Sequence, residues 1–452
     1  AIAVAALSVV PFTGSLHGDF LYDDLNIIGN EVVNGGALAW DAWTTDFWGL
    51  LLSSRFSHKS YRPLAVLTFR WTAAWFGVDD PFPYHVACVA LHTLNSVLVL
   101  GLGTALLPAP AARLGAAVFA VHPLHTETVT SVTYRADLLS AAFVLAALWT
   151  YVRCEAANGW ARSGALHAVS VLLAVAATLC KEQGVTVMGV FVVYDVCCAF
   201  VRQQWGGAKW RRVLFRGAVT TAAVGCVVGV RLWLNNGPPP AWSNEDNIVV
   251  DEPSPLGRHL TLQTLMGMHM AWLVWPVTLC HDWNFRSLTP VLSFGDPRNL
   301  YWVAMHAALV SASVYALHGL VVRRSIAPPP CPLAPPVALS PPAATAVCAA
   351  TIVLPFLPAS NLFFPVGFTL AERVMYTPSI GFCWLVGLWV HRGGRGRPLA
   401  AAALRLVCAA VIVAGALHTY RRSCQFVNFE TLLRADAEAN PTNAKNWYSL
   451  GE

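Results

Sequence analysis

The chain has 452 residues, of which 56% are hydrophobic and only 12% are charged, and its mean hydropathy is +0.53. These values lie far outside those of soluble globular domains and are typical of polytopic membrane proteins. The formal net charge of +5 is therefore a signal of membrane topology, because Lys and Arg gather in cytosolic loops. It does not indicate a nucleic-acid partner.

Apolar segments long enough to cross a hydrocarbon core of about 30 Å recur along the whole chain. The sequence begins at Ala1 inside such a run, which we interpret as a first span that is truncated at its front. We predict eleven crossings, at residues 1–14, 84–107, 111–127, 136–152, 164–180, 184–201, 213–234, 300–322, 343–358, 374–391 and 399–419.

One further apolar segment, 259–280, is ambiguous, and the positive-inside rule decides its interpretation. The basic loops that should face the cytosol contain Arg113, Arg153 with Arg162, the run 202–216, Arg323 with Arg324, and the run 392–397. If 259–280 crossed, the last two loops would fall on the wrong side. We therefore expect 259–280 to be re-entrant or interfacial, which places the first loop and the C-terminus together on the non-cytosolic side.

Two adjacent carboxylates, Asp23 and Asp24, open the long polar loop 15–83 that follows the first span. Such acids, with cations further along the loop, indicate membrane-embedded glycosyl transfer, since a hydroxyl must lose a proton and an anionic leaving group must be held. Adjacent residues do not share a helical face, so at most one of the two can be the base. The alternative is a solvated loop start that caps a helix.

The same loop contains Lys59, Tyr61 and Arg62, and Arg62 directly precedes Pro63. Proline restricts the residue before it to an extended conformation, so we expect Pro63 to present the Arg62 guanidinium rigidly to a phosphate. A basic loop near lipid headgroups is the alternative interpretation.

A third polar group, His122, His125 and Glu127 followed by Arg135, lies between two predicted spans. Ionisable groups at the edge of a bilayer are costly, which favours a functional role over a structural one. A metal site is the sharper alternative because the two imidazoles have ligand spacing on a helix. However, Pro123 and the missing third ligand argue against it, and we predict no metal.

Two charged dipeptides, Lys181–Glu182 and Glu372–Arg373, lie at the ends of apolar spans. Each could form an ion pair that is purely structural, but sequence neighbours need not pair with each other. A functional and a structural role are equally open for each dipeptide.

The C-terminal residues 440–451 fit the opening of a tetratricopeptide repeat, with Trp447, Leu450 and Gly451 at the spacing of that motif. One partial repeat cannot bury its own apolar face. We favour the start of a repeat array over a stray helix, and such arrays bind extended polypeptide. The turn-rich loop 235–258 and the proline-dense linker 327–342 suggest no chemistry.

Six sequence blocks, in this order, resemble the transmembrane and tetratricopeptide repeat-containing proteins, and the resemblance covers nearly the whole chain. The blocks are Tyr22–Asp24, Asp46–Gly49, Ser57–Leu64, Phe119–Glu127, Cys180–Gly184 and Ala371–Cys383. That family is similar to GT-C glycosyltransferases of the endoplasmic reticulum. The resemblance implies an all-α polytopic membrane protein with a GT-C-like transmembrane domain over 1–420, luminal loops 15–83 and 235–299, and a luminal helix with the start of the repeats over 421–452.

The resemblance also implies a protein O-mannosyltransferase of the endoplasmic reticulum membrane, multi-pass, with its C-terminal repeat region in the lumen. The donor would be dolichyl phosphate mannose, the acceptors Ser or Thr of luminal domains such as cadherins, and no cofactor would be needed. Asp23 and Asp24 match the diacidic GT-C motif, with Asp23 as the base and Asp24 orienting it or the acceptor. Attack opposite the phosphate would invert the anomeric centre.

For the donor phosphate and lipid headgroup we expect Arg62 first, with Lys59, Arg135, Lys181 and Arg373 as further candidates. The supporting polar site would comprise Tyr61, His122, His125, Glu127, Glu182 and Glu372. The first rival is a non-enzymatic membrane scaffold that binds luminal proteins through its repeats. The second is an ion-coupled transporter, although inverted repeats and broken helix pairs are not evident.

Overall fold

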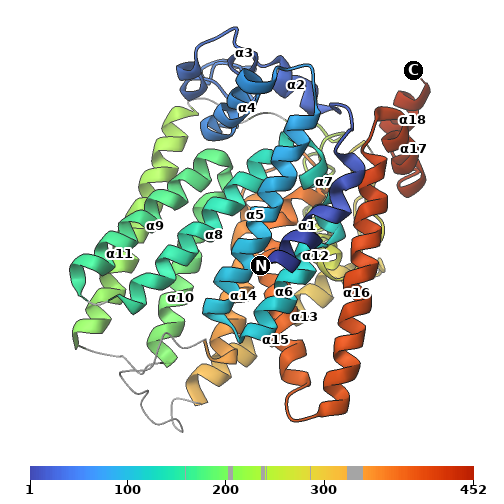
Figure 1. Cartoon of the computed structure of the whole chain (residues 1–452). Helices are drawn as coiled ribbons and strands as arrows, with labels where there is room; N and C mark the ends of the chain where they lie inside the picture. The colour runs from blue at the N-terminus through green and yellow to red at the C-terminus, as the bar shows by residue number, and fades with distance from the viewer. Residues whose placement is uncertain are drawn as a thin grey trace.

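The computed structural model describes residues 1–157, 159–201, 207–235, 240, 242–285, 287–322 and 339–451. Within these ranges the regular structure is helical, apart from an isolated bridge between Thr45 and Leu51. The predicted all-α polytopic fold is confirmed, and Figure 1 shows a bundle of long helices with smaller helices gathered at one end.

Nine helical segments of the described chain are long and apolar enough to cross a membrane. They contain α5 (Phe82–Leu106), α8 (Arg135–Ala156), α9 (Trp160–Cys180), α10 (Val187–Val201), α11 (Gly207–Leu234), α13 (Asn299–Val322), α14 (Pro341–Phe356), α15 (Tyr376–Gly393) and α16 (Pro398–Gln425). Two shorter apolar segments, α1 (Ile2–Val9) with the turn that follows it and α6 (Ala109–Ala120), overlap the two other predicted spans, but α6 ends at Ala120, before the predicted end of the span 111–127. The predicted spans thus appear as helices in the expected order.

The ambiguous segment forms α12 (Pro255–Val274), which is not among the span-like helices of the described residues. Its first turn is capped by Ser254, whose Oγ accepts a hydrogen bond from the Gly257 amide. The topology around it stays a prediction. The basic residues Arg202, Arg323 and Arg324, and most of the linker 327–342, lie outside the described residues.

The predicted first loop, 15–83, is built from helices rather than from extended chain. It contains α2 (Asp23–Gly29), α3 (Glu31–Asn34) and α4 (Pro63–Phe76), which enclose a small apolar core. Pro63 occupies the first turn of α4, where its missing N–H leaves no helical hydrogen bond unmade. Arg62 has ψ of 54°, so the expected extended conformation is wrong; its side chain turns toward an ion pair described below.

The C-terminal segment forms two short helices, α17 (Phe429–Ala439) and α18 (Ala444–Gly451). Asn428 caps α17 by accepting a hydrogen bond from the Thr431 amide. Because α16 continues to Gln425, the predicted domain boundary at 420 falls inside a helix. In Figure 1, α17 and α18 lie at the same end of the bundle as α2, α3 and α4.

Helices α6 and α15 pack closely because small residues face each other across their contact. A Cβ on Gly387 would clash with the carbonyl oxygen of Ala111, and one on Gly115 would lie 2.7 Å from that of Cys383. Side chains at these positions would therefore separate the two helices. Since the loop that follows α6 carries part of the polar site, this packing also positions the site.

The Gly387→Ala substitution is expected to lower the free energy of unfolding by about 1–3 kcal/mol, because the added methyl group overpacks the α6–α15 contact. The measurement is thermal unfolding of the detergent-solubilised protein. Gly217→Ala is the matched control, since a Cβ on Gly217 in α11 would meet no atom within 4 Å. Equal melting temperatures for the two variants would contradict the expectation.

Candidate functional site

Asp24 is a structural anchor at the start of α2. Its Oδ1 accepts hydrogen bonds from the amide and hydroxyl of Thr133, both at 2.7 Å, and from the Ser131 hydroxyl at 3.1 Å. Its Oδ2 accepts one from the Leu21 amide at 3.3 Å. Because these protein donors contact both oxygens, Asp24 holds the first loop against the turn before α8.

Asp23 has a different environment, although it is the adjacent residue. It lines a cavity of about 160 Å³, and within the described residues no group donates a hydrogen bond to its carboxylate. The cavity is lined by Tyr22, Asp23, Tyr134, His281, Asp282, Asn284, Gly367, Phe368, Leu370, Arg373 and Lys445. Asp23 is thus the acid of the pair that is available to a bound molecule.

Burial raises the pKa of Asp23 above its ordinary value of 3.8. The charge of Arg373 lowers it, that of Asp24 raises it, that of Lys445 lowers it and that of Asp282 raises it. The raised pKa makes Asp23 a stronger base than a solvated carboxylate.

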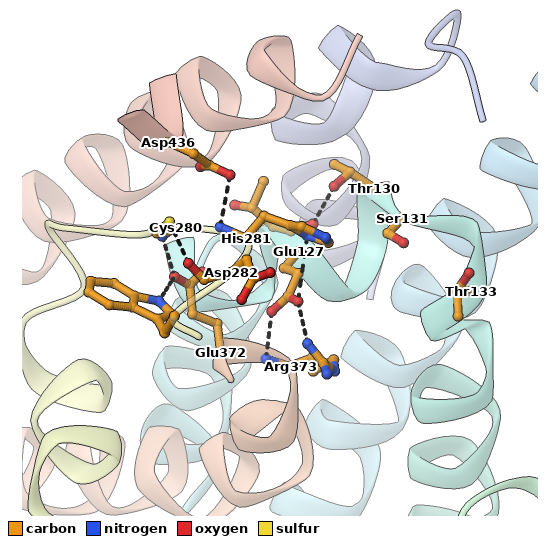
Figure 2. Close-up of polar contacts among 12 residues, drawn as sticks. Glu127, Thr130, Ser131, Thr133, Cys280, His281, Asp282, Glu372, Arg373 and Asp436 are labelled. Atoms are coloured by element: carbon orange, nitrogen blue, oxygen red, sulfur yellow. Dashed lines mark hydrogen bonds and ion pairs between the residues drawn. The ribbon is translucent and has the colours of Figure 1, made fainter. Parts of the chain in front are cut away.

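Arg373 is held at the cavity by Glu127. Its Nη1 donates to Glu127 Oε1 at 2.8 Å and its backbone amide donates to Oε2 at 3.0 Å (Figure 2). The guanidinium carbon also lies 4.6 Å from the centroid of the Tyr134 ring. Glu127 is 1% exposed and belongs to α7 (Thr126–Thr130), so a buried carboxylate fixes a cation that reaches the cavity.

The neighbouring Glu372 points instead at the loop that follows α12. Its Oε1 accepts hydrogen bonds from the Cys280 amide at 2.6 Å and from Trp283 Nε1 at 3.3 Å. Asp436 of α17 contacts the same loop, because its Oδ2 accepts a hydrogen bond from the His281 amide at 3.2 Å (Figure 2). Burial lowers the pKa of His281 to about 3, so its ring is neutral near pH 7.

Lys445 of α18 brings a second cation to the cavity. Its Nζ lies 3.0 Å from Asp282 Oδ2, and both residues line the cavity. A helix of the C-terminal segment therefore contributes a charged side chain to the same space as Asp23, which lies near the other end of the chain.

A band of ion pairs extends from Arg373 toward the first loop. Arg62 Nη2 lies 2.9 Å and Arg231 Nη2 lies 2.6 Å from different oxygens of Glu182, and Lys181 pairs with Asp137. Burial lowers the pKa of Lys181, and the charges of Arg62 and Arg373 add to this lowering.

With the pair of Arg373 and Glu127, the band contains four cations and three carboxylates, which leaves one positive charge in excess. Neither predicted dipeptide forms an internal ion pair; each member has a partner elsewhere.

Three other predicted site residues, Lys59, Tyr61 and Arg135, do not line the cavity and instead stabilise other parts of the structure. Lys59 Nζ donates to the carbonyl oxygens of Leu52 and Ser54, while the Tyr61 carbonyl accepts from Arg231 Nη1 at 2.9 Å. Arg135 is buried beside two aromatic rings, with its guanidinium carbon 4.4 Å from the Phe69 centroid and 5.3 Å from that of Tyr84.

His122 and His125 join the loop after α6 to other helices. His122 Nε2 lies 3.0 Å from the carbonyl oxygen of Leu273 in α12, and His125 Nε2 lies 2.8 Å from Ser379 Oγ in α15. A search of the described residues finds no group of three or more His, Cys, Asp or Glu side chains arranged to hold a metal ion.

Of the predicted phosphate-binding cations, all of which are described, Arg373 is the one that lines the cavity. Sequence reasoning missed Tyr22, Tyr134, His281, Asp282 and Lys445 as site residues. The polar run 281–284, directly after the apolar segment 259–280, was an available signal. No sequence signal indicated Lys445 as a site residue, because it lies in a stretch that matches the start of a tetratricopeptide repeat.

Comparison with known proteins identifies relatives over nearly the whole chain. The family model described as "Protein O-mannosyl-transferase TMTC, DUF1736" matches residues 236–310. Protein O-mannosyl-transferase TMTC4 of Mus musculus is 33% identical over 492 residues, which cover 100% of this chain and 63% of the relative. Protein O-mannosyl-transferase TMTC3 of Mus musculus is 33% identical over 460 residues, which cover 97% of this chain and 47% of the relative. The chain thus spans less than two thirds of the length of these relatives.

A crystal structure of the Archaeoglobus fulgidus oligosaccharyltransferase, in complex with Zn and sulfate, has the same overall fold. The TM-score is 0.53 at 12% sequence identity, and the match covers 99% of this chain and 56% of that chain. At this identity the likeness shows the fold alone, which is of the GT-C glycosyltransferase type that the sequence predicts.

The two acids are expected to differ in their effect on stability. Asp24→Ala leaves buried donors on Thr133 and Ser131 without an acceptor and should lower the free energy of unfolding by at least about 2 kcal/mol. Asp23→Ala removes a carboxylate that accepts no hydrogen bond from the described residues, so its melting temperature should stay within about 1 °C of the unmodified protein. Thermal unfolding in detergent measures both, and equal losses would contradict the assignment.

Proposed function

We propose that this chain, which belongs to the TMTC family, transfers mannose from dolichyl phosphate mannose to Ser or Thr hydroxyls of luminal protein domains. The proposal rests on one observation above all: the free carboxylate of Asp23 faces a cavity that Arg373 and Lys445 also line. A base for an alcohol and cations for a phosphate are the two requirements of transfer from a lipid-linked sugar.

The proposed reaction is a single displacement at the anomeric carbon. The acceptor oxygen forms a bond to that carbon while an Asp23 oxygen takes its proton. The bond between the anomeric carbon and the phosphate oxygen breaks, and its electron pair leaves with dolichyl phosphate. Attack on the face opposite the phosphate gives an α-linked mannose from a β-linked donor.

The timing of proton transfer follows from the acidity of the two groups. A carboxylate is a weak base for an alcohol, so Asp23 takes the proton as the anomeric bond breaks and the alcohol becomes more acidic. The raised pKa of Asp23 reduces the difference between its pKa and that of the alcohol.

Cations in and beside the cavity are proposed to stabilise the leaving phosphate. Arg373 and Lys445 reach the cavity itself, and Lys181, Arg62 and Arg231 extend the positive band beyond it. These side chains can offset the charge of one phosphate, so the proposed reaction requires no metal ion or other cofactor.

The cellular setting belongs to the same proposal. We place the protein in the endoplasmic reticulum membrane, with Asp23 and the C-terminal repeat region on the luminal side. Cadherin-type domains are the proposed acceptors. This location matches the donor, since the reacting end of a lipid-linked sugar lies at the membrane surface, where the first loop opens.

Transfer of labelled mannose from dolichyl phosphate mannose to a cadherin domain tests the proposal, using membranes that contain the repeat-bearing protein. Asp23→Asn should lower the rate at least about a hundredfold, because it removes the base. Asp19→Asn, which alters an exposed carboxylate of the same loop, should leave the rate unchanged. Equal label with and without Asp23, or no label at all, would favour the non-enzymatic scaffold.

The pH dependence gives a second test of the base. Activity should fall as the pH drops through the folded-state pKa of Asp23, since the protonated acid cannot accept a proton. Asp282→Asn removes a negative charge that raises this pKa, so the acidic limb of kcat/KM should move to lower pH. A limb that stays in place, as expected for Asp19→Asn, would argue against Asp23 as the titrating group.

A further inference from the structure

The residue before the proposed base has an uncommon backbone conformation. Tyr22 has φ of 48° and ψ of −113°, in the half of conformational space that residues with a Cβ rarely occupy. Such a conformation persists only where the surroundings hold it in place. The contacts of Tyr22 therefore determine where the next residue, Asp23, lies.

Those contacts come largely from the far end of the chain. The Tyr22 ring stacks on His281, with centroids 4.6 Å apart, and meets Phe429 of α17 edge-on at 5.0 Å. Lys445 of α18 places its Nζ 5.5 Å from the Tyr22 centroid. His281 is in turn held by Asp436 of α17 through its backbone amide.

The segment just before Tyr22 is attached to the same C-terminal region. The Asp19 amide donates a hydrogen bond to the Val427 carbonyl at 2.8 Å. Leu21 packs with Phe426 and Leu432 in a small apolar cluster. The residues that lead to Asp23 are thus held in place by the end of α16 and by α17.

We infer that α17 and α18 position the Asp23 carboxylate, with Phe429 holding the Tyr22 backbone and Lys445 setting the charge beside the base. This inference rests on the proposed function, because it assigns these residues a role in the same reaction. Phe429 is a positioning residue, since it acts only through Tyr22, whereas Lys445 acts on the base through its charge in addition to its proposed part at the phosphate. Helices α17 and α18 therefore form part of the wall of the cavity and do not only link the membrane helices to the predicted repeats.

Helix α18 and the turn before it are attached to the loop after α12 by polar contacts. Thr442 Oγ1 donates to the Ser287 carbonyl at 3.1 Å, Asn443 Nδ2 donates to the Asp282 carbonyl at 2.8 Å, and Lys445 pairs with the Asp282 side chain. These contacts and those of Tyr22 together fix the position of the wall, and with it the position of Asp23.

Mannose transfer by the repeat-bearing protein tests the role of Phe429. Phe429→Ala should lower kcat about tenfold to a hundredfold, with KM for dolichyl phosphate mannose unchanged, because a displaced base slows the chemical step. Tyr448→Ala, which truncates an exposed aromatic ring of α18, is the control and should leave kcat unchanged.

In a Tyr22→Gly background the effect of Phe429→Ala on kcat should disappear, because glycine adopts positive φ without support. An undiminished effect there would mean that Phe429 acts on the fold only.

The charge of Lys445 is tested separately by the pH profile. Lys445→Met removes a cation that lowers the pKa of Asp23, so the acidic limb of kcat/KM should move to higher pH. Lys445→Arg should restore the limb. If the limb of the Met variant coincides with that of the Arg variant, Lys445 does not set the charge beside the base.

A readout that needs no catalysis separates this inference from the proposed function. In an Asp23→Cys chain, labelling of residue 23 by a small water-soluble thiol reagent is followed by peptide mass spectrometry. Phe429→Ala should change the labelling rate severalfold, whereas Tyr448→Ala should not. If the labelling rate changes but the protein with Asp23 intact transfers no mannose, the function is overturned and the positioning stands. Normal transfer with equal rates in both variants would overturn the positioning alone.

Discussion

The ion pair of Glu127 with Arg373 is the contact on which the candidate site depends. A carboxylate as buried as Glu127 is destabilising unless a cation and hydrogen bonds compensate it, and Arg373 supplies both through its side chain and backbone amide. The pair ties α7 to the turn before α15. It therefore fixes the cation at the cavity and directs the preceding residue, Glu372, to the loop after α12.

Around this pair the structure separates two kinds of charged residue. Asp24, Lys59 and the two terminal nitrogens of Arg135 have hydrogen-bond partners in the protein, and these residues hold the first loop together. Asp23 and Arg373 keep a face toward the cavity. The separation follows local geometry and not residue type, since Asp23 and Asp24 are neighbours in one helical turn.

The sequence predicts the helical bundle well because each span is an apolar run with its own length and basic flanks. It also includes Asp23 and Arg373 among the predicted site residues, and both line the cavity. The sequence does not reveal which charged residues form ion pairs. It ranks Arg62 first among the predicted phosphate ligands, yet the Arg62 guanidinium pairs with Glu182, which is 120 positions away in the chain. Lys445 was missed for a similar reason, because only the docking of α18 onto the loop at Asp282 brings it to the cavity.

The hydrogen bond between Asp19 and Val427 has a consequence for biosynthesis. The ribosome makes the acidic loop before the segment that supports it, and all the helices that lie between them are made in the interval. The strained turn at Tyr22 therefore lacks its support until α17 has emerged. A nascent chain inserted halfway into the membrane would hold its acidic residues without a completed cavity, so the cavity at Asp23 can form only after α17 and α18 have been made.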